Sequence, residues 1–255
     1  MSEESARTQI AFLIIGDEVL SRSVRETNLD YGLLTASRYG YTVGEVRMLG
    51  DSIPDIASAL RDLSPEKNLV ITSGGVGPTH DDVTMEAVAV AFGVPLTEES
   101  RMLRFLQRQY GEELSPAVKS MAFIPQGTVV EIDDDIHWPL LRCRNCCILP
   151  GLPQAFRSRI DRIFAALPAQ PPVSAAAVYT DYDESVFADH LTALQTAHPE
   201  VEIGSYPEVP REAGYAARVT VKSRDAAAVQ IVYDKLLVLF GGKGWLKRSQ
   251  DPQFL

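Results

Sequence analysis

The first two thirds of the chain alternate between two hydrophobic patterns. Short continuous apolar runs predict buried strands, and apolar residues three or four positions apart predict helices that cover them. The predicted strands are Gln9–Ile15, Tyr41–Met48, Asn68–Ser73, Val129–Ile132 and Cys146–Leu149. The predicted helices begin near Thr27, Ile53, Val83, Met102 and Phe156. This alternation predicts an α/β domain over residues 8–167, with a mostly parallel sheet between two layers of helices.

The pattern changes after a proline-rich segment, Pro168–Pro172, which is typical of a stiff linker. Residues 173–242 predict a strand, a helix, two strands and a helix, in the order βαββα. The corresponding segments are Ala175–Tyr179, Glu184–Leu194, Val201–Ser205, Tyr215–Val221 and Ala226–Phe240. We therefore expect a second, small α+β domain. Residues 243–255 are polar and are expected to form a flexible tail.

Composition restricts the class of partner. The chain has 24 Lys and Arg against 34 Asp and Glu, a formal net charge of −10, so neither nucleic acid nor an anionic membrane is the expected partner. No apolar run approaches the roughly 20 residues of a membrane span. The first eight residues hold no signal-peptide core, and the three cysteines form no disulfide framework, so a cytoplasmic location is expected.

The segment Ser73–Thr84 carries the clearest chemical signal. It reads SGGVGPTHDDVT and joins a predicted strand to a predicted helix, an order that presents backbone N–H groups to an anion. Glycine at positions 74, 75 and 77 permits positive φ and close approach of a ligand, and Pro78 stiffens the turn. The spacing fits neither a P-loop nor a dinucleotide fingerprint. A tight connection without a ligand remains the alternative.

Aspartates surround this predicted turn. Asp81 and Asp82 end it, and one of them is expected to cap the following helix, which leaves the other for a metal or a ligand hydroxyl. Asp17 and Asp51 follow the first and second strands, and the carboxyl ends of parallel strands share one edge of a sheet. Because carboxylates repel phosphate unless a cation bridges them, Asp17, Asp51 and Asp82 are the predicted metal set for Mg2+ or another divalent cation. Solvated loop carboxylates are the alternative.

Four further polar residues are candidate ligand contacts. Thr27 and Asn28 stand at a helix start, where capping and ligand contact are both open. His80 lies within the turn, where it would hydrogen-bond a phosphate, act as an acid or fix the loop. Thr79 precedes it and joins the predicted anion site.

The cysteines raise the alternative of a zinc site. His137, Cys143, Cys146 and Cys147 follow the spacing H-x5-C-x2-C-C. Adjacent residues on a strand point to opposite faces, so Cys146 and Cys147 do not readily share one metal. Buried small apolar residues are the favoured interpretation.

These motifs together carry a family resemblance. Gly16–Leu20, Thr27–Asn28 and Gly74–Thr84 resemble the MoaB/Mog-like molybdopterin-binding domain family. The resemblance is strongest to the CinA N-terminal domain and the molybdopterin-binding-like domain of eukaryotic FAD synthase. Glu86–Ala89, Asn145, Leu149–Pro153 and Gly204–Pro207 continue it, so that it extends from about Gln9 to Gly241. It implies a three-layer α/β fold, a small KH-like domain after it, and a homo-oligomer.

The resemblance also implies an activity. In the nearest branch it implies a pyrophosphatase that depends on a divalent metal and K+ and acts on FAD or ADP-ribose. The first hypothesis is therefore metal-dependent hydrolysis of a dinucleotide diphosphate, with the amides of Gly74 to Thr79 holding the diphosphate and Asp82 positioning water. In the Mog-like branch the same crevice adenylylates molybdopterin, and the functional aspartates match Asp51 and Asp82. Molybdopterin binding or adenylylation, and a non-catalytic nucleotide-binding module, are the alternatives.

Overall fold

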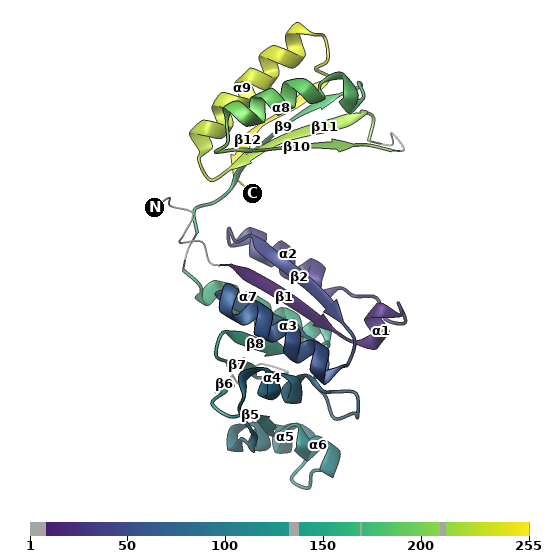
Figure 1. Ribbon diagram of the computed structural model, residues 1–255, viewed down its shortest axis with the longest axis vertical. Helices are drawn as coiled ribbons and strands as arrows, with labels where there is room; N and C mark the ends of the chain where they lie inside the picture. Colours follow the sequence, from purple (N-terminus) through teal and green to yellow (C-terminus); the bar gives the residue numbers. More distant parts are fainter. Residues whose placement is uncertain (1–8, 133–137, 169, 210–212, 255) are drawn as a thin grey trace. The chain divides into compact units, whose positions relative to one another are not determined.

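The computed structural model describes residues 9–132, 138–168, 170–209 and 213–254. The chain divides into two compact units, Met1–Pro168 and Ala169–Leu255 (Figure 1). Each unit has its own hydrophobic core.

The first unit is built on a six-stranded sheet with the order β2-β1-β3-β8-β7-β6. Four neighbouring strands are parallel: β1 (Ile10–Ile15), β2 (Val43–Leu49), β3 (Leu69–Ser73) and β8 (Cys146–Leu149). The last two, β7 (Leu140–Cys143) and β6 (Val129–Glu131), run antiparallel to their neighbours. The predicted mostly parallel sheet is confirmed.

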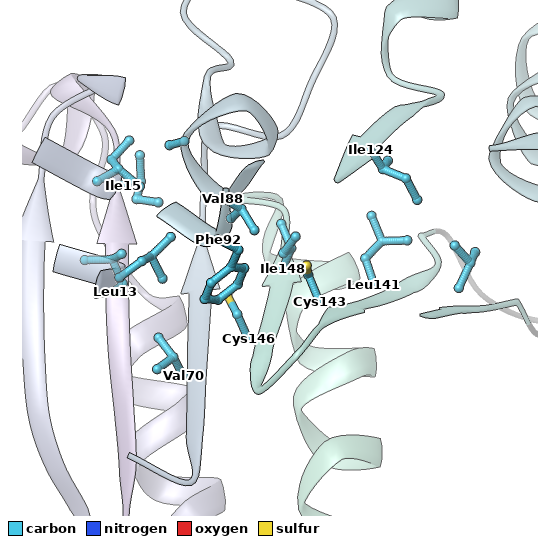
Figure 2. Packing of buried hydrophobic residues seen from close by; sticks show 14 of the residues in the cluster. Leu13, Ile15, Val70, Val88, Phe92, Ile124, Leu141, Cys143, Cys146 and Ile148 are labelled. Atoms are coloured by element: carbon cyan, nitrogen blue, oxygen red, sulfur yellow. The ribbon is translucent and has the colours of Figure 1, made fainter. Parts of the chain in front are cut away.

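Helices cover both faces of this sheet because β1 is apolar at every position. Ala11, Leu13 and Ile15 pack with α3 (Ile53–Glu66), α4 (Thr84–Phe92) and α5 (Ser100–Tyr110). Figure 2 shows part of this cluster, with Leu13, Ile15 and Val70 near Val88 and Phe92 of α4. Ile10, Phe12 and Ile14 pack on the other side, with α2 (Asn28–Arg38) and α7 (Pro153–Ala166). The expected three-layer arrangement is therefore confirmed.

Cys146 and Cys147 belong to the two different faces of the sheet. Cys146 packs in the cluster with α3 and α4, and Cys147 in the cluster with α2 and α7. These two residues and Cys143 are buried free thiols, as the apolar interpretation expects. Burial raises the pKa of Cys147 to about 12 and that of Cys146 well above its ordinary value. His137, the fourth ligand in the zinc alternative, lies outside the described residues.

Several short elements are absent from the predicted list. The residues after the first predicted strand contain a helix of one turn, α1 (Asp17–Leu20), which begins where Val19 N donates to Gly16 O (3.2 Å). The strands β4 (Leu96–Glu98) and β5 (Phe123–Pro125) pair antiparallel, with α6 (Pro116–Ser120) between α5 and β5. Elements of three to five residues are too short to show a hydrophobic period.

The second unit is an antiparallel sheet with helices over one face. Its strands, in the order β10-β11-β9-β12, are β10 (Glu202–Pro207), β11 (Ala217–Ser223), β9 (Ser174–Thr180) and β12 (Arg248–Phe254). A 3-10 turn, η2 (Glu184–Val186), precedes α8 (Ala188–Ala197), and α9 (Ala226–Gly242) follows β11. The core joins Val178 and Val219 to Val232, Leu236 and Phe240 of α9. This is the expected small α+β arrangement.

The prediction of a flexible tail over residues 243–255 is wrong. Residues Arg248–Phe254 form β12, which pairs antiparallel with β9 along most of its length. The strand is polar because it lies at an edge, and side chains hold it: the Arg248 guanidinium lies 4.0 Å from the centre of the Tyr179 ring, and Tyr233 donates to Asp251 Oδ1 (2.8 Å). None of the helices in the described part of the chain is both long and apolar enough to cross a membrane.

Candidate functional site

The glycine turn between β3 and α4 is held against the end of β1. Gly74 and Gly75 have φ values of 109° and 62°. A Cβ at position 74 would lie 2.0 Å from the carbonyl oxygen of Ile15, and one at position 75 would lie 2.4 Å from Thr84 Oγ1. The Thr84 hydroxyl donates to Gly74 O (2.8 Å), and the Thr84 N–H donates to Gly75 O (3.0 Å). Only glycine fits this approach, and the two bonds from Thr84 hold the turn against α4.

Part of the predicted N–H cradle is already used. Gly74 N donates to Leu149 O (3.1 Å), and Thr79 N donates to Asp82 Oδ2 (2.9 Å). The N–H groups of Gly75, Val76 and Gly77 donate to no atom of the described residues. The set of donors free for an anion is therefore narrower than predicted, at positions 75 to 77.

Asp82 is positioned by the turn rather than by the helix. Its Oδ2 accepts from both the N–H and the hydroxyl of Thr79. The N-cap of α4 is Val83, and no side chain caps the helix, so the expectation that Asp81 or Asp82 caps it is wrong. The helix begins at Thr84, one residue later than predicted. Asp82 therefore still belongs to the turn, where its carboxylate accepts from Thr79. Its Oδ1 accepts no hydrogen bond from the described residues and is free for a ligand.

Asp17 and Asp51 are in direct contact at the neighbouring strand ends. Asp17 N donates to Asp51 Oδ2 (2.9 Å). A Cβ at Gly50 would lie 2.2 Å from Asp17 Oδ1, so glycine makes room for this carboxylate. Burial raises the pKa of the Asp51 carboxyl, and the hydrogen bond from Asp17 opposes the rise.

The carboxylates of the three strand ends act on one another. The negative charges of Asp17, Asp81 and Asp82 raise the pKa of Asp51 further. However, no three of the His, Cys, Asp and Glu side chains that the structure describes lie close enough together to hold a metal ion. The metal set of Asp17, Asp51 and Asp82 therefore stays a prediction. The donor chemistry fits Mg2+, which proteins bind through one or two carboxylates and the phosphates of a substrate.

Some of the predicted ligand contacts line one of two separate cavities. A cavity of about 190 Å³ is lined by the turn and by residues of α4, β4, α6 and β5. Its walls are Gly75, Val76, Gly77, Thr79, Asp82, Met85, Glu86, Leu96, Ser120, Met121 and Phe123. A second cavity of about 80 Å³ has Thr27, Asn28 and Ser73 among its walls. Pro78, His80 and Asp81 are exposed and line neither cavity in the described part of the chain.

Asn28 links the second cavity to the sheet edge. Its side chain is 4% exposed, and Nδ2 donates to Ser73 Oγ (2.9 Å) and to Gly151 O (2.8 Å). The buried Oδ1 has no hydrogen-bond partner among the residues that the structure describes. A buried acceptor without a donor is costly unless a ligand or water supplies one, which supports ligand contact at Asn28.

Thr27 occupies the N-cap position of α2 but makes no side-chain cap hydrogen bond. The side chain of Glu26 caps the helix instead, because its Oε1 accepts from the N–H groups of Asn28 (2.7 Å) and Leu29 (2.9 Å). Sequence reasoning missed the roles of Glu26 and Gly151. Gly151 follows a proline, which marks a loop, but nothing local pairs it with Asn28, 123 positions earlier.

Comparison with known proteins places these features in a family. Residues 11–169 match the model of a probable molybdopterin binding domain, and residues 172–248 match the FAD synthase middle domain. A probable FAD synthase of Caenorhabditis elegans is 30% identical over 92% of this chain and 50% of its own length. A CinA-like protein of Myxococcus xanthus is 33% identical over 64% of this chain and 42% of its own.

A solved structure agrees with the first unit. The crystal structure of CinA from Thermoplasma acidophilum superposes with a TM-score of 0.58 and 27% identity, over 62% of this chain and 96% of that one. The fold is a three-layer α/β domain with the glycine turn at one edge of its sheet. The chain belongs to the molybdopterin-binding domain family, in the branch that includes CinA and FAD synthase. It spans about half the length of the FAD synthases that it matches.

Proposed function

We propose that the first unit hydrolyses a dinucleotide diphosphate of the FAD or ADP-ribose type. The observation that carries this proposal is the juxtaposition of surplus carboxylates with unpaired backbone donors at one sheet edge. The carboxylates raise the pKa of Asp51, and the free N–H groups lie at Gly75 to Gly77. A bound anion would accept hydrogen bonds from the free N–H groups, and a bound cation would neutralise the carboxylates. The similarity to a probable FAD synthase and to a CinA-like protein favours a nucleotide ligand.

The turn binds and orients the diphosphate. The N–H groups of Gly75, Val76 and Gly77 donate to phosphate oxygens. Glycine at positions 75 and 77 lets this backbone pass close to the Thr84 hydroxyl and the Asp82 carboxylate. The cavity that these residues line has Met85 and Phe123 in its wall, which supply apolar contact to the organic part of the ligand.

Asp82 serves as the base. Thr79 fixes one carboxylate oxygen, and Oδ1 accepts a hydrogen bond from the attacking water. The water oxygen bonds to phosphorus, its proton passes to Asp82, and the bond from phosphorus to the bridging oxygen breaks. The products are two mononucleotides, AMP and FMN from FAD, or AMP and ribose 5-phosphate from ADP-ribose.

Asp17, Asp51 and Asp82 are the residues that would hold the divalent cation, with K+ as a second ion. A divalent cation held by these residues would supply positive charge to the diphosphate and polarise its phosphorus–oxygen bond. The donors are hard oxygen ligands, and Mg2+ is commonly held by one or two carboxylates together with the phosphates of a substrate, so the site does not require all three carboxylates to meet before the ligand binds.

The test is a product assay. The purified chain is incubated with FAD or ADP-ribose, Mg2+ and K+, and AMP is measured by chromatography. We expect Asp82→Asn to lower the rate by about 100-fold or more, in the range of an acid–base residue. Asp55→Asn, which changes an exposed carboxylate at the start of α3, is expected to retain activity. Release of AMP at the level of the Asp82→Asn background would overturn the proposal.

The match to a molybdopterin binding domain supports a second candidate, the binding or adenylylation of molybdopterin. Pterin fluorescence that copurifies with the protein, or consumption of ATP that depends on molybdopterin, would favour it. Binding of FAD without turnover would instead favour a non-catalytic nucleotide-binding module.

A further inference from the structure

A larger cavity lies in the first unit, apart from the candidate site. It has a volume of about 590 Å³ and is lined by Arg101, Arg104, Gln107, Arg108, Glu112 and Ile132. None of these residues lines the two cavities at the sheet edge. The glycine turn and its aspartates therefore do not account for it.

The helix α5 sets the arginines of this cavity side by side. Positions 101, 104 and 108 are three and four residues apart, which places them on neighbouring turns along one side of a helix. Met102 and Leu106 are fully buried in the core and fix how the helix lies. Arg101 Nη1 donates to the carbonyl oxygen of Val130 in β6 (2.8 Å), which ties one guanidinium to the adjacent strand.

These guanidinium groups are not neutralised by neighbours. In the part of the chain that the structure describes, Arg101, Arg104 and Arg108 form no ion pair. Glu112 is the one acidic residue in the described lining, beside three arginines; Asp133, Asp134 and Asp135, which follow Ile132 in the sequence, lie outside the described residues. Like charges at this spacing repel one another, and the whole chain carries a formal charge of −10. Among the described residues the lining therefore carries more positive than negative charge, which favours an anion there although the chain as a whole is acidic.

The chemistry of the lining indicates which anion. A guanidinium donates two parallel hydrogen bonds to a phosphate, and several together suit a ligand with more than one negative charge. The volume lies within the range of cavities that bind small molecules, roughly 300–1,000 Å³. We propose that this cavity binds a small phosphate-bearing anion, inorganic diphosphate or a nucleoside diphosphate, through Arg101, Arg104 and Arg108.

Calorimetric titration of the full chain with pyrophosphate or ADP in the presence of EDTA tests this proposal. The chelator removes the cation that the carboxylate-rich turn requires, so the titration reports on the arginines whether or not the chain is a hydrolase. We expect binding by the unchanged chain, about tenfold weaker binding for Arg104→Gln, and still weaker binding for Arg104→Gln/Arg108→Gln. Both positions are exposed, so the variants are expected to unfold at the temperature of the unchanged chain.

Arg61→Gln is the matched control, because Arg61 is an exposed arginine of α3 that lines none of these cavities. Equal affinity for pyrophosphate and ADP would identify the inorganic anion as sufficient, and tighter binding of ADP would identify a nucleotide; both support the proposal. No heat of binding from either ligand would overturn it. Unchanged affinity in the double variant, or equal loss in Arg61→Gln, would overturn it as well.

Discussion

The N–H of Asp17 donates a hydrogen bond of 2.9 Å to Oδ2 of Asp51, and this bond joins the ends of β1 and β2. The contact brings the carboxylates of Asp17 and Asp51 close to each other, although their like charges repel. The hydrogen bond fixes the two strand ends relative to each other. The repulsion between the two carboxylates is expected to lower the stability of the fold.

The first prediction concerns Asp51→Asn. The raised pKa of Asp51 means that the folded state binds its proton more tightly than the unfolded state does. Folding of the unchanged chain is therefore weakened as pH rises through the folded pKa of Asp51. The amide oxygen of the substituted side chain would still accept from Asp17 N. We expect Asp51→Asn to be more stable at pH 7 in EDTA, by at most about 1 kcal/mol because the carboxylate is partly exposed.

Urea denaturation at several pH values measures this difference. It is expected to shrink as pH falls through the folded pKa of Asp51 and to vanish below its ordinary value near 3.8. A variant that is less stable than the unchanged chain at pH 7, or a difference that does not change with pH, contradicts the prediction.

The second prediction separates steric approach from backbone strain at glycine. Gly74→Ala introduces a Cβ that would lie 2.0 Å from Ile15 O, at a φ of 109°. Gly111→Ala introduces one at a similar φ of 98°, with nothing within 4 Å. We expect about 1 kcal/mol of destabilisation at position 111 and at least about 3 kcal/mol at position 74. Chemical denaturation measures both variants. An equal loss of unfolding free energy in the two would show that close contact with β1 adds no cost at position 74.

The third prediction concerns Asn145, which fastens the end of α3 to the turn between β7 and β8. Its Nδ2 donates to Ser64 O (2.9 Å) and Lys67 O (2.8 Å), and its Oδ1 accepts from Ser64 Oγ (2.6 Å). We expect Asn145→Ala to cost about 2–3 kcal/mol in the free energy of unfolding, because the carbonyls at the helix end lose their donors.

Asn145→Asp is the informative companion to this variant. It keeps an acceptor for Ser64 but loses both donations, so it is expected to be nearly as destabilising as Asn145→Ala. Gln109→Ala, at an exposed position of α5, is expected to change stability by less than about 0.5 kcal/mol. Full stability of Asn145→Asp would mean that the donations contribute nothing.

The fourth prediction concerns the thiols. Burial raises the pKa of all three cysteines, to about 12 for Cys147, so thiolate is scarce at pH 8. We expect no rapid reaction of the folded chain with a thiol reagent such as 5,5′-dithiobis(2-nitrobenzoate), and reaction of three thiols per chain in guanidinium chloride. Fast modification of a thiol in the folded chain would contradict the buried apolar role.

Long elements were predictable because their pattern is local. Strand β1 is continuously apolar and buried on both faces, which identifies a central strand of a covered sheet. Strand β7 has four residues, too few to distinguish it from a loop. The tail was misassigned because β12 is polar, and edge strands are recognised by their pairing partner rather than by their own residues.

The candidate site was likewise predictable only where its features depend on local sequence. The glycine turn is a contiguous motif and can be located from the sequence, but its close approach to Ile15 of β1 depends on tertiary packing. The role of Asp82 was only half predictable, because whether it caps α4 or turns back to Thr79 depends on where the helix begins. The contact of Asn28 with Gly151 depends on tertiary packing alone.

The pairing of β12 with β9 has a consequence for the order of events during translation. The first strand of the second unit cannot gain its edge partner until residues 248–254 have left the ribosome. By then β10, β11 and α9 have all been synthesised, so the unit completes its sheet in a single late step. A ribosome that stalls before Arg248 would hold β9 with one open edge, a surface for a chaperone or for the same strand of another nascent chain.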